Sequence, residues 1–209
     1  MASATRGLQR CALSRHSPDV STEQPSDSHL LALARTDPAL LGVLYERHAD
    51  SVFRYLARRV GHQPAEDLLG EVFVAAVSAR MRVVPHASGS ALPWLYGIAG
   101  NVVRAHLRGN RPTAIQLDGF VTDWDAVDDR LDAAAQRSAL QAALTLLSAV
   151  DRELLLLVAW EGLTPAQAGA ALALTPTAAR SRLHRARGRA QAALDDFART
   201  PLTTEGHSP

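Results

Sequence analysis

The chain has 209 residues, which is enough for one large or two small domains with a hydrophobic core. Its formal net charge is +1 and its 22 lysine-or-arginine positions are all arginine, so any affinity for nucleic acid must come from charge concentrated in particular segments. The single cysteine, Cys11, excludes an intrachain disulfide and a cysteine-rich zinc site. The lack of a long apolar run and of a signal-peptide pattern predicts a cytoplasmic protein with no membrane insertion.

Helical periodicity dominates the first half of the chain, and strand signals are weak. Residues 1–28 mix Ser, Pro, Asp, Gln and Arg without a period, which predicts a disordered tail. The apolar residues that follow predict three helices, at His29–Val60, Pro64–Ala79 and Trp94–Leu107. A break at residues 61–64 separates the first two helices, and a loop over residues 81–93 precedes the third. Pro112 ends this amino module, residues 29–112.

An acidic segment separates the amino module from a second helical module. Residues 113–136 contain six aspartates and little periodicity, which predicts a flexible acidic linker. Apolar periodicity resumes at Ala139 and continues to Trp160, and the carboxyl module is expected over residues 137–198. A second tail is expected at residues 199–209.

Two short helical segments in the carboxyl module each open on a Thr-Pro pair. In the first, Thr164 is a suitable N-cap and Gln167 completes a capping box. The second begins at Thr175, and the gap between the segments, residues 173–174, is as short as the corner of a helix-turn-helix. The pattern therefore predicts a helix-turn-helix.

The second of these segments is densely cationic. A narrow apolar stripe repeats at helical spacing, at Ala179, Leu183, Ala186 and Ala190. Arginines surround it, at positions 180, 182, 185, 187 and 189, and no acid follows until Asp195. A small packing face beneath a cationic face is typical of a helix that enters the major groove of DNA. The alternative is a solvated amphipathic helix that is merely basic, although such helices usually interleave acids at i+4.

Several motifs in the right order resemble the extracytoplasmic-function (ECF) group of bacterial RNA polymerase sigma factors. In the carboxyl module they are Asp151-Arg152-Glu153, Trp160-Glu161-Gly162-Leu163 and Ser181 to Arg187. In the amino module they are Ala65 to Leu68, Glu71-Val72-Phe73 and Trp94 to Ala99 with Asn101. The resemblance implies that the amino module is sigma region 2, a helical bundle, and that the carboxyl module is region 4.

The resemblance also implies a role for individual residues of the amino module. Asp67, Leu68 and Glu71 match the helix that binds the largest subunit of core polymerase, although without the resemblance the acids would be read as a solvated patch. The loop residues His86, Ser88 and Ser90 match a pocket for a base flipped out of the −10 promoter element. Further −10 contacts are implied for Trp94, Asn101, Arg104 and Arg108, and Trp94 alone is more often a core residue.

In the carboxyl module the resemblance implies contacts with the −35 promoter element. The residues expected to face bases are Thr177, Arg180, Ser181 and His184. The residues expected to hold phosphates, which position the helix but carry no sequence information, are Arg182, Arg185 and Arg187. The acidic linker is expected either to thread through the polymerase near the nascent RNA or to act as a soluble tether.

This chain departs from the family pattern at a few positions. Gly70 stands where the family often has glutamine in the polymerase-contact helix, and Gly100 replaces a common arginine. Ala173 replaces the usual glycine of the helix-turn-helix corner, which predicts a slightly strained turn. These departures affect promoter preference more than the class of protein.

The implied function is a sigma factor that binds core RNA polymerase, through its largest and second-largest subunits, and directs promoter recognition, DNA melting and initiation. An anti-sigma factor is the expected regulator. The alternatives are a stand-alone helix-turn-helix regulator, which would need a sensory domain, and a pure interaction protein. The eight histidines are scattered and no Gly-rich phosphate loop occurs, so we expect no enzymatic activity, cofactor or metal site.

Overall fold

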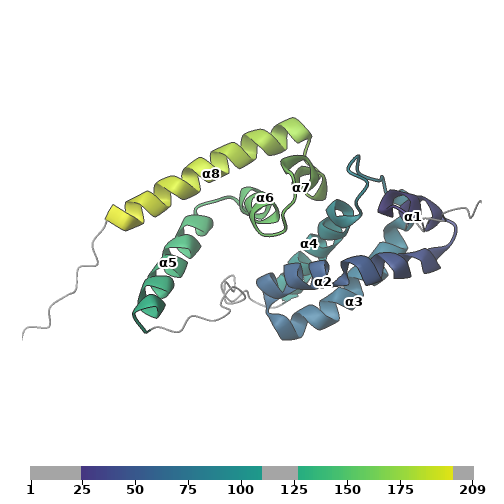
Figure 1. Cartoon of the computed structure of the whole chain (residues 1–209), viewed down its shortest axis with the longest axis horizontal. Helices are drawn as coiled ribbons and strands as arrows, with labels where there is room; N and C mark the ends of the chain where they lie inside the picture. The colour runs from purple at the N-terminus through teal and green to yellow at the C-terminus, as the bar shows by residue number, and fades with distance from the viewer. Residues whose placement is uncertain (1–24, 110–126, 200–209) are drawn as a thin grey trace, which may run out of the picture.

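The computed structural model describes residues 25–109 and 127–199, with side chains for 25–109 and 136–199, and all regular structure in these ranges is helical (Figure 1). The amino module contains α1 (Asp27–Leu33), η1 (Pro38–Leu40), α2 (Leu41–Val60), α3 (His62–Ala79), η2 (Arg80–Arg82) and α4 (Leu92–Gly109). The carboxyl module contains α5 (Val127–Thr145), α6 (Ala149–Ala159), α7 (Pro165–Ala171) and α8 (Pro176–Arg199). The predicted all-α fold with two helical modules is confirmed.

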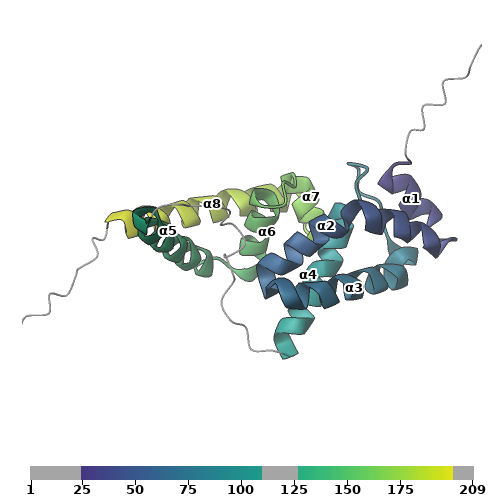
Figure 2. The same ribbon diagram turned by 60° about the horizontal axis from the view of Figure 1, so that its bottom comes forward.

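Helices α2, α3 and α4 form a bundle around the core of the amino module (Figure 2). Leu56, Val72 and Leu95, one from each helix, are completely buried in it. Gly61 adopts a φ of 85°, which favours glycine and lets α3 begin directly after α2. The start of α3 at His62 is two residues earlier than expected, because Pro64 fits in the first helical turn, where its missing N–H needs no partner.

The amino module begins earlier than the sequence suggested. Residues 25–28 had been assigned to the tail, but α1 begins at Asp27. Ser26 caps this helix by accepting a hydrogen bond from the His29 N–H, and the Asp27 side chain is buried against α2. Residues 1–24 of the expected tail lie outside the described residues.

The carboxyl module also extends beyond its expected start. Helix α5 occupies residues 127–136 of the segment expected to be a linker, where Leu131 and a run of alanines favour a helix. Residues 113–126 lie outside the described part of the chain. Helices α5, α6 and α8 enclose a small apolar cluster that contains Leu144, Leu156 and Ala186.

The two modules are packed against each other, with α7 against α4. Leu154 and Leu157 of α6 belong to the same apolar cluster as the core of the amino module. Gly97 makes the close approach possible, since a Cβ there would lie 3.0 Å from the Ala171 carbonyl oxygen. None of the helices in the described ranges combines the length and hydropathy needed to cross a membrane.

Candidate nucleic-acid interface

The helix-turn-helix is built from α7 and α8, as expected. The Thr164–Gln167 capping box at the start of α7 is confirmed, and Thr175 caps α8 by accepting a hydrogen bond from the Ala178 N–H (3.2 Å). At the corner, Ala173 adopts a φ of 55°, which confirms the expected strain at this non-glycine residue. The capped corner fixes the direction in which α8 leaves α7.

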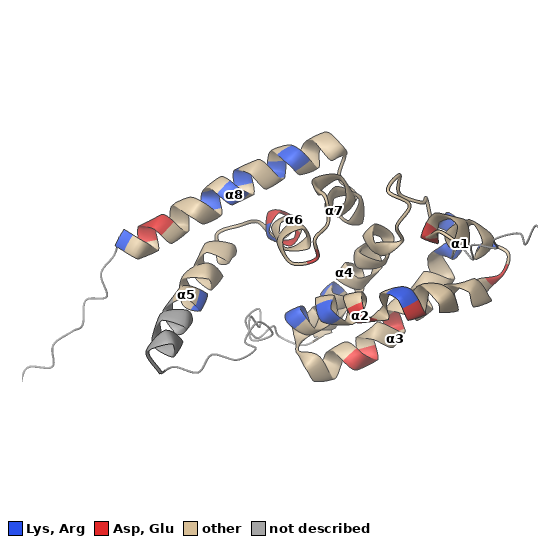
Figure 3. Cartoon of the chain, in the orientation of Figure 1, with Lys and Arg blue, Asp and Glu red and all other residues tan. Residues whose placement is uncertain are grey.

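Helix α8 carries a series of arginines along its length (Figure 3), and most of them are exposed. The predicted apolar stripe is buried, at Ala179, Leu183, Ala186 and Ala190. The exposed residues include six that were predicted to contact DNA, at Thr177, Arg180, Ser181, His184, Arg185 and Arg187. Thr177, Ser181 and His184 follow one another at helical spacing opposite the stripe, so they share the outermost face.

Arg182 has a different environment from the other arginines of this surface. Its Nη1 lies 3.1 Å from Asp151 Oδ1, and Arg189 Nη2 lies 2.7 Å from Asp151 Oδ2. Burial opposes ionisation of Asp151, but hydrogen bonding with Ser148 and with the two guanidinium groups holds its pKa below the ordinary value. Arg182, expected to hold phosphate, is therefore paired with a carboxylate of α6 that it shares with Arg189.

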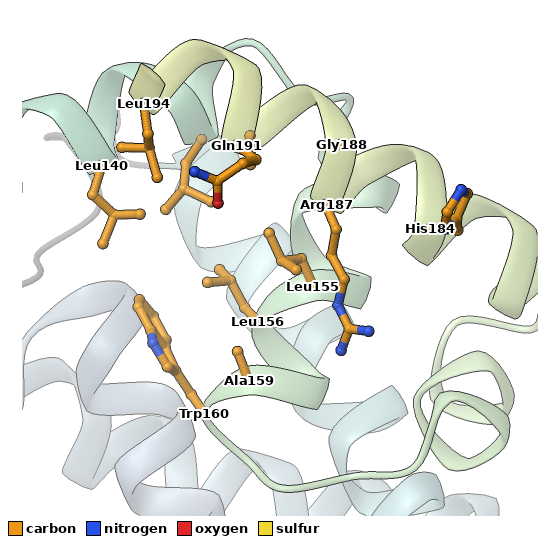
Figure 4. Close-up of a pocket in the computed structure, with 12 residues that line it drawn as sticks. Leu140, Leu155, Leu156, Ala159, Trp160, His184, Arg187, Gly188, Gln191 and Leu194 are labelled. Carbon is orange, nitrogen blue, oxygen red and sulfur yellow. The ribbon is translucent and has the colours of Figure 1, made fainter. Parts of the chain in front are cut away.

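A groove lies between α5, α6 and α8 (Figure 4). It has a volume of about 560 Å³. Leu140, Leu155 and Trp160 contribute to its apolar lining, and His184 and Arg187 lie on the α8 side. The sequence pattern indicated these leucines only as core residues.

In the amino module, the loop between η2 and α4 contains the predicted base pocket. His86 Nδ1 lies 2.8 Å from Ser88 Oγ and accepts a hydrogen bond from the Ser88 N–H (3.0 Å). Ser90 Oγ accepts from the Leu92 N–H (3.2 Å) and caps the start of α4. Ser88 is exposed, whereas His86 and Ser90 are partly buried, so the three side chains lie together on a short, internally bonded turn.

The predicted −10 residues of α4 occupy two environments. Trp94 is partly buried against the core, whereas Asn101, Arg104 and Arg108 are exposed. Arg104 donates a hydrogen bond to Asn101 Oδ1 (2.5 Å), and both side chains line a cavity of about 560 Å³ between α4, α6 and α7. Trp94 lines the same cavity. The structure therefore brings these three residues together beneath the carboxyl module.

The predicted polymerase-contact residues of α3 divide in the same way. Asp67 and Glu71 are exposed on one helical face, but Leu68 is only 3% exposed and packs in the core. Leu68 therefore holds α3 in place and offers no surface to a partner. Val74, which was not among the predicted contacts, is 69% exposed at helical spacing from both acids.

Buried charges join the two modules, and the sequence did not predict them. Glu153 of α6 accepts hydrogen bonds from the Tyr55 hydroxyl (2.8 Å) and from Arg59 Nη2 (2.8 Å) of α2. Burial and the Glu153 carboxylate raise the pKa of Tyr55 well above its ordinary value, so its hydroxyl remains a donor. Gly100 leaves room for this contact, because a Cβ there would lie 3.1 Å from the Tyr55 hydroxyl.

Glu161, in the turn after α6, makes a second set of contacts with the amino module. It accepts hydrogen bonds from Arg58 Nη2 (2.5 Å) and from the Tyr96 hydroxyl (3.5 Å). Its side chain is only 3% exposed. We call the six residues of both sets the interdomain charge cluster: Tyr55, Arg58, Arg59, Tyr96, Glu153 and Glu161.

Comparisons with known proteins agree with this architecture. Residues 44–113 match the family model of sigma-70 region 2, and residues 137–189 match that of sigma-70 region 4. RNA polymerase sigma factor CarQ of Myxococcus xanthus is 35% identical over 145 residues, which cover 68% of this chain and 82% of CarQ. ECF RNA polymerase sigma factor SigL of Mycobacterium tuberculosis is 29% identical over 154 residues, 72% of this chain and 86% of SigL.

A solved structure is similar over most of its length. CnrH, in complex with the cytosolic domain of CnrY, has a TM-score of 0.56 and 26% identity to this chain. The match covers 82% of this chain and 99% of CnrH. The similarity therefore extends over both helical modules.

Proposed function

Because this chain belongs to the extracytoplasmic-function group of RNA polymerase sigma factors, we propose that its two modules read the two elements of a promoter while it is bound to core polymerase. It is a non-catalytic initiation factor that directs promoter recognition and transcription initiation. Its place of action is then the cytoplasm, where bacterial polymerase meets DNA. The observation that carries the proposal is the capped helix-turn-helix, whose second helix is exposed and cationic.

We assign the −35 element to α8. Thr177, Ser181 and His184 occupy the outermost face, and Arg180 is close enough along the helix to reach the same base edges. Arg185 and Arg187 are exposed and form no ion pair with the described residues, so they are assigned to phosphates. Arg182 is assigned to positioning the helix through Asp151 instead.

The −10 element is assigned to the amino module. The loop that carries His86, Ser88 and Ser90 offers polar groups to an unpaired base, and Asn101 with Arg104 and Arg108 continues the surface along α4. Trp94, which is packed against the core, is assigned a supporting role at the start of α4. Core polymerase is assigned to the face of α3 formed by Asp67, Glu71 and Val74.

Promoter binding requires the modules to separate. The −10 and −35 elements are roughly 25 base pairs apart, which is about 85 Å of duplex at 3.4 Å per pair. In the packed arrangement, by contrast, Asn101 and Arg104 line the same cavity as Ala173 of the helix-turn-helix corner, and α7 is in contact with α4. The packed arrangement therefore suits a resting form of the protein, held by the interdomain charge cluster.

We propose a restraining protein, an anti-sigma factor, as a further partner. Support comes from CnrH, which was solved together with the cytosolic domain of CnrY. Such a partner would act on the same equilibrium between packed and separated modules.

Transcription with purified core polymerase tests the proposed function. On promoter fragments, the chain with core should give promoter-specific run-off transcripts, and neither component alone should do so. If the chain instead shifts the DNA as a dimer and core adds nothing, it is a stand-alone regulator.

A charge reversal tests the polymerase surface separately. Asp67→Arg with Glu71→Arg should weaken core binding at least about 100-fold, because like charges then face the expected basic partner. Glu46→Arg with Asp50→Arg changes the charge by the same amount at exposed positions of α2 and should leave binding intact. Equal core affinity of the two double variants, measured by co-purification and titration, would refute the assignment.

A further inference from the structure

Asp27 of α1 is a buried charged residue that lies outside the interdomain charge cluster. Its Oδ1 accepts a hydrogen bond from Arg47 Nη1 (3.0 Å), and its Oδ2 lies 2.6 Å from His48 Nε2. Both partners belong to α2. A carboxylate removed from water in this way needs several donors to remain ionised.

The third donor to Asp27 comes from the predicted base-pocket loop. The Ala91 N–H, at the end of that loop, donates to Asp27 Oδ2 (2.9 Å). Beside it, the Ser28 N–H donates to the Gly89 carbonyl oxygen (3.1 Å). The first turn of α1 therefore holds the loop main chain on both sides of Ser90.

These contacts fix a segment that has little regular structure of its own. Within the loop, hydrogen bonds join near neighbours, such as the Gly89 N–H to the His86 carbonyl oxygen (2.9 Å). Such a turn defines its own shape but not its orientation relative to α4. The contacts with Asp27 and Ser28 supply that orientation, because α1 is itself fixed to α2 through Arg47 and His48.

We propose that Asp27 is a positioning residue for −10 recognition: it holds the loop of His86, Ser88 and Ser90 in the orientation that receives an unpaired base. The proposal rests on the function proposed above for that loop. Asp27 lies outside residues 44–113, which match the region 2 family model. It also precedes residues 29–112, the amino module expected from the sequence. A base pocket discriminates only if its polar groups are held in place, and Asp27 holds the main chain between them and α4.

The substitution Asp27→Asn tests this role in the holoenzyme. The side chain keeps its size, but its amide group cannot accept hydrogen bonds from Arg47, His48 and Ala91 together. We measure run-off transcription from promoters that carry each of the four bases at every −10 position. The preference at the position read by the loop should fall at least about fivefold, since a charge-assisted contact is lost. Core affinity and −35 preference should stay within about twofold of the unsubstituted protein.

Asp37→Asn is the matched control. Asp37 also accepts a backbone hydrogen bond in the amino module, from the Ala39 N–H (3.0 Å), but this bond caps η1 and does not involve the loop. It should leave the −10 preference unchanged. If both asparagine variants lower the preference equally, Asp27 acts only through general stability and the proposal is refuted.

Hydrogen exchange provides a measurement that does not depend on transcription. In Asp27→Asn, amides of residues 86–91 should exchange at least about tenfold faster, while those of α2 and α3 keep their protection. Unchanged exchange in the loop would refute the proposal. Exchange that rises throughout the module would also refute it, because the role would then be structural.

The triple variant His86→Ala, Ser88→Ala and Ser90→Ala tests the base pocket itself, independently of Asp27. If the triple variant keeps the full −10 preference, the loop is not a base pocket and the proposed function of the loop fails. If the triple variant loses the preference but Asp27→Asn keeps it, the loop function stands and the inference about Asp27 alone fails.

Discussion

The loop of the amino module and α8 of the carboxyl module are the two proposed DNA-reading surfaces, and each depends on a buried aspartate. Asp27 follows the N-cap Ser26 of α1, and Asp151 lies in the first turn of α6 after the N-cap Ser148. Both carboxylates have a pKa below the ordinary value because, although burial opposes ionisation, hydrogen-bond donors surround them. The same local device therefore occurs in both modules.

The two aspartates hold different parts of the chain. Asp27 accepts from a main-chain N–H of the loop, whereas Asp151 accepts from the side chains of Arg182 and Arg189. A helix satisfies its own main-chain groups, so α8 needs only its side chains to be arranged. A loop lacks such regular main-chain hydrogen bonds, so its main-chain groups must bond to other segments of the protein.

The turns of the two surfaces differ as well. The loop uses Gly89 at a φ of 78°, a conformation that costs glycine little. The corner of the helix-turn-helix uses Ala173 at a φ of 55°, where the Cβ is strained. We call Asp27 and Asp151, with their hydrogen bonds, the two anchors. The carboxyl surface thus combines the Asp151 anchor with a strained corner.

The largest expected effect comes from removing the two carboxylates that hold the modules together. Glu153→Ala with Glu161→Ala leaves Arg58 and Arg59 without these carboxylates, and removing one partner of a buried ion pair costs about 3–5 kcal/mol. We expect the modules to part and the radius of gyration to rise in small-angle scattering. Glu66→Ala, at an exposed carboxylate, is the control, and identical scattering curves for all three proteins would contradict the prediction.

The next prediction sharpens the distinction between reading and holding within α8. Arg180→Ala should remove about 1–3 kcal/mol of discrimination at one −35 position. Arg187→Ala should weaken all promoters about equally and lower the salt slope of DNA binding by about one. Binding measured on −35 variants at several salt concentrations distinguishes the two, and a uniform loss in both variants would mean that α8 is only an electrostatic clamp.

A third prediction contrasts the two anchors. Asp151→Asn should destabilise the fold by about 1–2 kcal/mol, because charge-assisted hydrogen bonds to Arg182 and Arg189 are lost. The loss is no larger because both arginines are partly exposed and solvent weakens these contacts. It also releases Arg182 and Arg189, so non-specific DNA binding should tighten and its salt slope should steepen by up to about two. Asp27→Asn should leave that slope unchanged. A shallower slope for Asp151→Asn would show that its arginines do not reach DNA.

The anchors also predict a dependence of stability on pH. Each folded-state pKa lies below the unfolded-state value of about 3.9, so each carboxylate stabilises the fold at neutral pH. That stabilisation is lost as the pH falls through the folded-state pKa. For Asp151, whose partners are Ser148 and two arginines, the stability difference between the unsubstituted protein and the asparagine variant should therefore be constant above about pH 5 and shrink below pH 4, as urea unfolding at each pH would reveal. A stability difference that grows towards acidic pH would show that the ionised carboxylate does not stabilise the fold.

The smallest expected effect concerns the corner. Ala173→Gly should stabilise the carboxyl module by about 0.5–1 kcal/mol, because glycine adopts a positive φ without strain. Ala178→Gly, in the first turns of α8, should destabilise it by about the same amount. Thermal unfolding of both variants measures the difference, and a lower melting temperature for Ala173→Gly would show that the turn is not strained.

Features determined by neighbouring residues were predictable from the sequence. The Thr164–Gln167 capping box and the strain at Ala173 depend on residues within one or two turns, and both are confirmed. The apolar stripe of α8 was equally evident, because burial of one helical face produces a regular spacing.

Features determined by distant residues were not predictable. The partners of Asp27 lie 20, 21 and 64 residues away, so nothing near Ser26 distinguished an ordered helix from a polar tail. The contacts between Arg59 and Glu153 span 94 residues. Leu68 was included among the polymerase contacts because the family resemblance covers the whole of its helix, whereas its position on α3 directs it into the core. In each case the missing information is which helical faces meet.

The close approach of α4 and α7 at Gly97 gives the chain an adjustable response to its partners. If partners bind only the form with separated modules, their apparent affinity falls in proportion to the fraction of molecules in that form, so a chain that is 1% separated binds about 100-fold more weakly than its intrinsic affinity. A methyl group at position 97 would press on the Ala171 carbonyl and raise that fraction. Under the proposed function, the lack of a side chain at position 97 favours the packed form and so raises the concentration of polymerase at which transcription responds.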